Sequence, residues 1–115
     1  MKTQIQSIHF IADDHLKTII LEKVYKLEKN FKQIESCIIT LRLDKNNENK
    51  NKVVEINLSI PGSRLFVVDQ SEKFEVAATL AIEEMRRQLQ KRKEEIRNQA
   101  QKNKEIIEEI EKIYS

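Results

Sequence analysis

The stretch VVEINLSIPGSRLFVVDQSEKFEVAATLAIEEM, residues 53–85, contains two hydrophobic periods, one after the other. Its first eight residues alternate apolar and polar side chains, which is the period of a half-buried β-strand. Pro61 and Gly62 suit the central positions of a type II turn, and residues 64–69 return as a strand that is apolar on both faces. From Ser71, which we expect to cap a helix, apolar residues recur every three to four positions. The stretch therefore predicts a β-hairpin followed directly by a helix.

The residues upstream of this stretch predict a strand, a helix and another strand. Residues 2–10 are strand-like, with Ile8 and Phe10 on one side and Ile5 opposite. Asp13 or Asp14 is suited to open a helix whose apolar stripe ends near Phe31. Residues 36–44 alternate as a strand, and the polar residues 45–52 are expected to form a mobile loop. The order β-α-β-β-β-α predicts an α+β two-layer sandwich: a four-stranded sheet, its first two strands parallel, with both helices on one face and the other face wet.

The end of the chain leaves two interpretations open. No Gly or Pro interrupts residues 71–115, but the apolar positions thin out after Leu89 and return in a charged context. The returning residues are Ile106, Ile107, Ile110 and Ile113. This pattern is consistent with a helix that continues beyond the domain and equally with a partly ordered tail. We therefore expect a domain over residues 1–98 and a charged helical extension or tail over 99–115.

Composition excludes several classes of protein. The chain has 115 residues, of which 39% are hydrophobic and 35% charged, so it has the material for one modest core. Its single cysteine excludes an internal disulfide and a multi-cysteine zinc site. No apolar run is long enough to span a bilayer, and the N-terminal residues lack the apolar core of a signal peptide. We expect a cytoplasmic protein with no membrane association.

The residue types that catalysis requires are not arranged as a site. His9, His15 and the two aspartates before the first helix are best explained as surface or capping residues. Cys37 lies among isoleucines, which is typical of a core position. A single glycine excludes a glycine-rich phosphate loop. We therefore expect no enzyme activity, no cofactor and no bound metal.

A local basic cluster is the most informative charge feature. The net charge is only +2, yet residues 85–93 contain five cations and no acid. Such a cluster is found on ordinary solvated helices, and it also suits a polyanion, because screening makes local charge more important than net charge. If the two helices lie side by side, lysines of the first helix face the same groove. Aromatic residues are scarce, which favours recognition of folded RNA by shape and phosphate over base stacking.

Three segments carry a resemblance to a known family. Residues 21–31 (LEKVYKLEKNF), 54–61 and 74–93 resemble the first helix, third strand and second helix of the ribosome hibernation factors. This family is also known as the ribosome-associated inhibitor or sigma-54 modulation family. The most specific element is Arg87-Gln88-Leu89-Gln90-Lys91-Arg92-Lys93. The resemblance covers about residues 1–98 and implies the same β-α-β-β-β-α fold.

The resemblance implies a function and some of its residues. It implies a protein of stationary phase or stress that binds the small ribosomal subunit at 16S rRNA near the decoding centre, blocking mRNA and tRNA. The cations that match the family pattern are Lys23, Lys26, Arg87, Lys91 and Lys93. Our electrostatic argument adds Lys29, Arg42, Arg86 and Arg92 as RNA-binding candidates.

The remaining expectations concern partners. The chain ends before the second domain of long family members, so it resembles a short form, monomeric when free. The sequence leaves open whether it would promote or prevent dimers of 70S ribosomes. The alternative function is a protein-interaction module, consistent with transcription-factor modulation, that acts through the long C-terminal helix.

Overall fold

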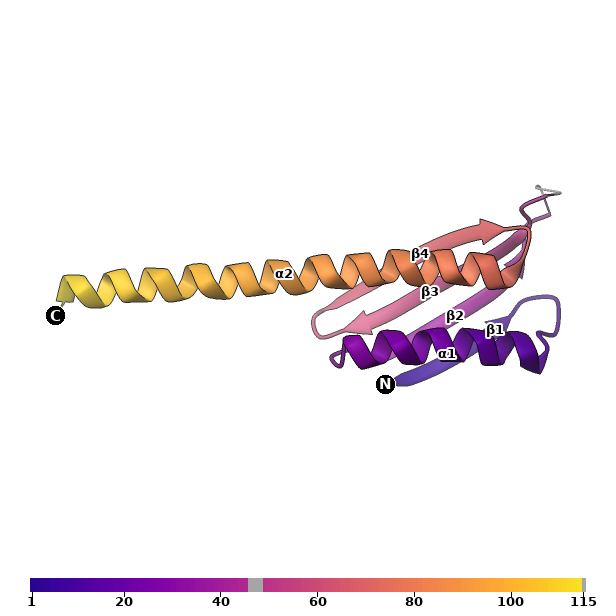
Figure 1. The fold of residues 1–115 in the computed structure, drawn as a ribbon, viewed down its shortest axis with the longest axis horizontal. Coiled ribbons are helices and arrows are strands. Elements are labelled where there is room, and N and C mark those ends of the chain that lie inside the picture. Colours follow the sequence, from indigo (N-terminus) through magenta and orange to yellow (C-terminus); the bar gives the residue numbers. More distant parts are fainter. Residues whose placement is uncertain (46–48, 115) are drawn as a thin grey trace.

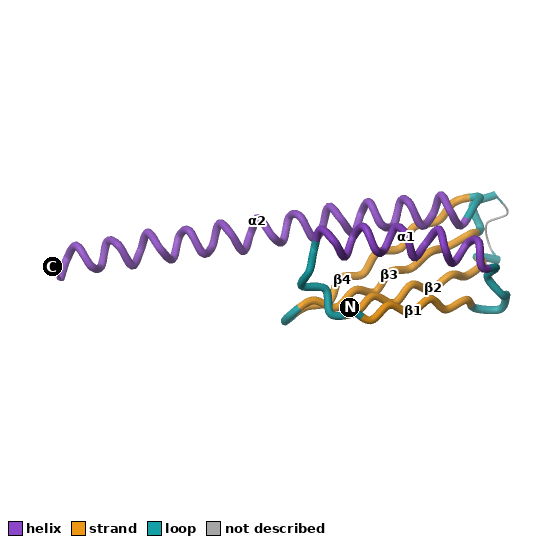
Figure 2. The backbone as a smooth tube through the Cα atoms, turned by 60° about the horizontal axis from the view of Figure 1, so that its bottom comes forward, coloured by secondary structure: helices purple, strands orange, loops and turns teal. Residues whose placement is uncertain are grey.

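The computed structural model describes residues 1–45 and 49–114 and has the predicted order of elements. The strands are β1 (Lys2–Ser7), β2 (Ser36–Leu43), β3 (Lys52–Ile60) and β4 (Ser63–Ser71). The helices are α1 (Asp14–Asn30) and α2 (Phe74–Tyr114). In the four-stranded sheet the order is β1-β2-β3-β4, with β1 parallel to β2 and the other pairs antiparallel. Both helices cover one face, and α2 projects far past the sheet (Figure 1; Figure 2). The predicted α+β fold is confirmed.

The core lies between the sheet and the helices. Alternate residues of β2 and β3 point into it, such as Ile39, Leu41, Ile56 and Leu58, each at most 1% exposed. Small side chains on the first turns of α2 face the same core, and they let the helix lie close to β3 and β4. Burial of this apolar face is the main stabilising contribution to the fold.

Two local signals act as the sequence indicates. Asp13 caps α1, since its Oδ1 accepts a hydrogen bond from the Leu16 N–H at 2.8 Å. Gly62 has a φ of 75°, the left-handed conformation that a type II turn requires at its third position, and Ile60 pairs with Ser63 across the turn. These two signals fix where α1 begins and where the β3–β4 hairpin closes.

The predicted first strand, residues 2–10, is longer than the one found. β1 ends at Ser7, Ile5 packs against the core, and Ile8 is exposed. The cause lies at His9, whose φ of 65° turns the chain away from the strand direction, so the alternation does not continue to residue 10. Phe10 still packs on the core, because its ring stacks on Phe74 with centroids 5.0 Å apart.

Two predicted boundaries also move. Ser71 ends β4 and does not cap the second helix, which begins at Phe74 with the Ala77 N–H donating to the Lys73 carbonyl. Lys52 pairs with Leu43 and Ser71, so it is the first residue of β3 and not the last residue of the loop predicted over 45–52. Residues 46–48 of that predicted loop lie outside the described residues. The predicted wet face is exposed but not wholly polar, since it presents Phe66 and Val68.

Candidate nucleic-acid interface

The two helices pack side by side and form a groove on the helical layer. In α1, the buried stripe that contains Val24 and Leu27 turns Lys23 and Lys26 toward α2. In α2, Thr79, Ile82 and Arg86 lie opposite them. The resulting hollow of about 300 Å³, here called the α1–α2 groove, is lined by residues 23, 26, 27, 30, 79, 82, 83 and 86. It therefore brings Lys23, Lys26 and Arg86 together, as the side-by-side arrangement of the helices predicts.

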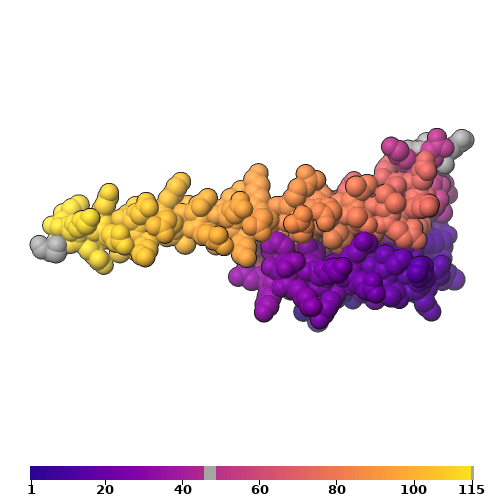
Figure 3. Space-filling view, in the orientation of Figure 1, coloured from indigo at the N-terminus to yellow at the C-terminus, as the bar shows by residue number. Residues whose placement is uncertain are grey.

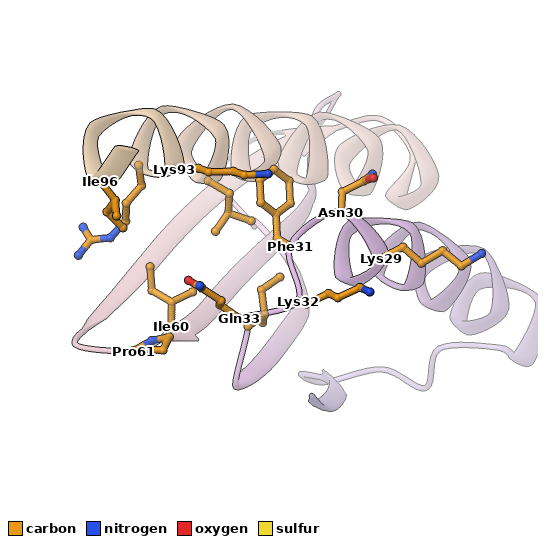
Figure 4. Close-up of a pocket in the computed structure, with 12 residues that line it drawn as sticks. Lys29, Asn30, Phe31, Lys32, Gln33, Ile60, Pro61, Lys93 and Ile96 are labelled. Atoms are coloured by element: carbon orange, nitrogen blue, oxygen red, sulfur yellow. The ribbon is translucent and has the colours of Figure 1, made fainter. Parts of the chain in front are cut away.

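A second hollow lies where α1 ends. This end cavity, of about 380 Å³, is enclosed by the end of α1, the segment after it, the β3–β4 turn and α2 (Figure 4). Its apolar lining includes Ile60, Leu89 and Ile96. The cations that line it are Lys29, Lys32, Arg92 and Lys93, and none of the described residues that line it is acidic. Asn30 borders both hollows, so the two form a continuous basic surface.

Ion pairing distinguishes the cations of this surface. Arg86 pairs with Glu83 at 3.0 Å, and Arg87 pairs with Glu84. The Lys29 ammonium lies 4.9 Å from the centre of the Tyr25 ring, a cation–π contact. The cations without an ion pair to any residue that the structure describes include Lys23, Lys26, Lys91, Arg92 and Lys93. These five charges are available to a polyanion without breaking an internal pair.

Arg87 lies on the other flank of α2, toward β4. Burial and the nearby Glu84 raise the pKa of the Asp69 carboxyl on β4, while the Arg87 guanidinium lowers it. Lys91 follows Arg87 by one helical turn and so shares this flank. Of the predicted cations, Arg87 and Lys91 are therefore outside the α1–α2 groove and the end cavity.

Arg42 is separated from all the other predicted cations. It alternates along β2 with the buried Cys37, Ile39 and Leu41, so its side chain lies on the sheet face opposite the helices. There its Nε donates a hydrogen bond to Glu55 at 2.8 Å. The fold does not bring Arg42 to the basic surface of the helices.

One known protein family matches most of the chain. The model of the family described as "Sigma 54 modulation protein / S30EA ribosomal protein" matches residues 3–97. The chain belongs to this family. Membership makes it a ribosome-associated protein, and the family is not a known enzyme family. A search of curated protein sequences found no match.

Solved structures show the same fold at low sequence identity. A ribosomal subunit interface protein from Coxiella burnetii is 22% identical, with a TM-score of 0.73, and the match covers 81% of this chain and 98% of that one. The N-terminal domain of Thermus thermophilus Protein Y is 17% identical, with a TM-score of 0.67, and the match covers 79% and 98%. At these identities the likeness establishes the fold alone.

Sequence reasoning missed three residues that border the basic surface. Lys32 follows α1 and lines the end cavity, Asn30 joins the two hollows, and Tyr25 holds Lys29. Lys32 was identifiable from its position two residues after the end of the helix. The roles of Asn30 and Tyr25 depend on how α1 packs against its neighbours.

The histidines and the cysteine lie apart from the basic surface. His9 and His15 are exposed, and burial raises the pKa of the Cys37 thiol to about 11, so it stays protonated near neutral pH. Within residues 1–45 and 49–114, no cluster of three or more His, Cys, Asp or Glu residues is placed to hold a metal ion. No helix in that part of the chain is long and apolar enough to cross a membrane.

Proposed function

We propose that this chain is a ribosome hibernation factor that binds the small ribosomal subunit at 16S rRNA near the decoding centre. In this proposal, it acts in the cytoplasm under stress or in stationary phase, excludes mRNA and tRNA by occupancy, and so inhibits translation without catalysing a reaction. Family membership supports the ribosome as partner. The name of the Coxiella protein, a ribosomal subunit interface protein, is consistent with a site between subunits.

The observation that carries the proposal is the continuous basic surface over α1 and α2. Among the residues that the structure describes, seven cations and one acid, Glu83, line the two hollows. Cations that neutralise phosphates release counterions from the RNA. This release favours binding at low salt, and the affinity falls steeply as the salt concentration rises. Cations held at fixed positions on the helical layer suit the regular phosphate spacing of folded RNA better than they suit unstacked bases.

The experiment is co-sedimentation of the protein with purified small subunits and with 70S ribosomes over a salt series. The wild type should co-sediment near stoichiometrically at low salt and dissociate as salt rises. A variant with Lys23→Glu and Lys26→Glu should bind at least about tenfold more weakly, and its salt slope should fall by about one unit for each lost phosphate contact.

A matched control variant reverses the charge of two lysines that lie outside the basic surface. Lys73 and Lys102 are exposed and line neither hollow of the basic surface, so the variant Lys73→Glu with Lys102→Glu should bind close to wild type. Equal losses in the two variants would show a net-charge effect and contradict the proposed surface. Absence of co-sedimentation for the wild type at low salt would contradict the function itself.

A second function is favoured by the exposed part of α2. The family description includes sigma 54 modulation, and the last third of the helix presents isoleucines to solvent, as expected for a protein-interaction module. Deletion of residues 99–115 distinguishes the two functions. Ribosome binding through the basic surface should survive the deletion, whereas binding of a protein partner through the helix should be lost.

A further inference from the structure

The end of α2 is a long exposed helix without a partner in the fold. After Leu89 the helix has no buried residue, and it extends well past the sheet (Figure 1; Figure 3). The family match stops at residue 97, so residues 98–114 of the helix lie outside the matched part of the chain. A helix that needs no partner is normally polar all round, yet this one exposes Ile96, Ile107 and Ile110.

The apolar residues of this segment follow the spacing of a coiled coil. Positions separated alternately by four and three residues form a single seam. The seam consists of Ile96, Ala100, Asn103, Ile107, Ile110 and Tyr114. The seam runs over residues 96–114, a little under three heptads, and Ile106 and Ile113 flank it. Leu89, one heptad earlier, is buried in the core of the domain and is not part of the seam. Five of these six seam positions are apolar, so the segment has the pattern of a helix that packs against another helix.

The charges along the segment identify the orientation of that other helix. Residues 97–104 contain the cations Arg97, Lys102 and Lys104 and no acid, whereas residues 105–111 contain four glutamates and no cation. A second copy in parallel register would place like charge against like charge, and Lys93 against the partner's Lys93. An antiparallel copy places the basic half of each helix against the acidic half of the other.

We propose that two copies of this chain pair through an antiparallel coiled coil of these segments. The register sets Ile96 opposite the partner's Tyr114 and Ala100 opposite the partner's Ile110. Arg97 then lies beside the partner's Glu111, and the two-fold symmetry makes this contact twice. Near the axis Ile106 meets the partner's Ile106. The same register sets Lys104 beside the partner's Lys104, a like-charge contact that the opposite-charge contacts on either side must outweigh. This proposal differs from the monomer expected from the sequence, and it does not rest on ribosome binding.

The first test is the molar mass of the purified full chain, measured by light scattering across a concentration series up to the millimolar range. The wild type should reach twice the monomer mass. Ile107→Asn with Ile110→Asn should remain a monomer throughout. The matched control, Val76→Asn with Leu80→Asn, changes two exposed apolar residues of the same helix away from the seam and should still dimerise. A wild type that stays monomeric, or a seam variant that still dimerises, overturns the proposal.

The orientation has its own test by charge exchange. Arg97→Glu alone and Glu111→Arg alone should each weaken dimerisation, because each leaves like charges side by side. The double variant restores opposite charges in an antiparallel pair and should return to near the wild-type dissociation constant. In a parallel pair these residues lie far apart, so failure of the double variant to recover overturns the antiparallel arrangement. Circular dichroism confirms that each variant keeps its helix content.

Discussion

Arg42 on β2 donates a hydrogen bond from Nε to Oε1 of Glu55 on β3, at 2.8 Å, on the sheet face that the helices leave open. Both side chains keep part of their surface in solvent. The pair therefore links two strands of the sheet, on the face opposite the basic surface of α1 and α2.

Replacing Arg42 should affect stability slightly and ribosome binding not at all. Arg42→Gln removes a partly exposed ion pair, which is worth roughly 0.2 to 1 kcal/mol in the free energy of unfolding. Urea unfolding measures this loss, and co-sedimentation with small subunits measures binding. A drop in ribosome affinity as large as that of the Lys23 and Lys26 variant would show that the open sheet face contributes to the interface.

The case of Arg42 shows what the sequence could and could not predict. Alternation along residues 36–43 correctly places Cys37, Ile39 and Leu41 in the core. The same alternation places Arg42 on the other face of the sheet, but a search for cations by type alone ignores the face. For Arg42, strand periodicity therefore predicts the location of the side chain better than its charge predicts a role in RNA binding.

Other details depended on tertiary packing that no local pattern contains. The helical period identifies the buried face of α2, but the direction in which α1 packs decides that Arg86 borders the groove and Arg87 faces β4. Likewise, the alternation of residues 2–10 has no signal for the left-handed conformation at His9, which ends the strand early. The elements were predictable, whereas the placement of side chains between elements was not.

Reversing the charge of the β4 flank should weaken ribosome association without unfolding the domain. Arg87→Glu with Lys91→Glu changes two exposed residues, and the exposed pair of Arg87 with Glu84 contributes little to stability. If phosphates reach this flank, the salt slope of binding falls by about one unit per residue. The thermal midpoint should stay close to that of the wild type. A double variant that co-sediments like the wild type would restrict the interface to the groove and the end cavity.

Enlarging a small side chain under α2 should destabilise the fold. Ala81 is fully buried where the helix approaches β3 and β4, so Ala81→Leu has no space to occupy and should cost about 1 to 3 kcal/mol. Gln90→Leu introduces the same side chain at an exposed position of the same helix and should change stability by less than about 0.5 kcal/mol. Denaturant unfolding of both variants checks the difference. Equal stability of the two would contradict close packing of α2 on the sheet.

The titration of Asp69 should respond in opposite directions to its two charged neighbours. Burial and Glu84 raise the pKa of the Asp69 carboxyl, and Arg87 lowers it. Glu84→Gln removes a nearby negative charge, so the pKa of Asp69 should fall toward its ordinary value. Arg87→Ala removes a stabilising positive charge, so the pKa should rise further.

Nuclear magnetic resonance of the Asp69 carboxyl carbon over an acid titration measures both shifts. Because the folded-state pKa is raised, the charged carboxylate is less favourable in the fold than in the unfolded chain. Its contribution therefore opposes folding at pH above the folded-state pKa, decreases as the pH falls below that value, and is absent below the lower pKa of the unfolded chain. Arg87→Ala should enlarge this pH dependence and Glu84→Gln should reduce it. Identical titration curves in the wild type and both variants would show that α2 does not hold these side chains against β4.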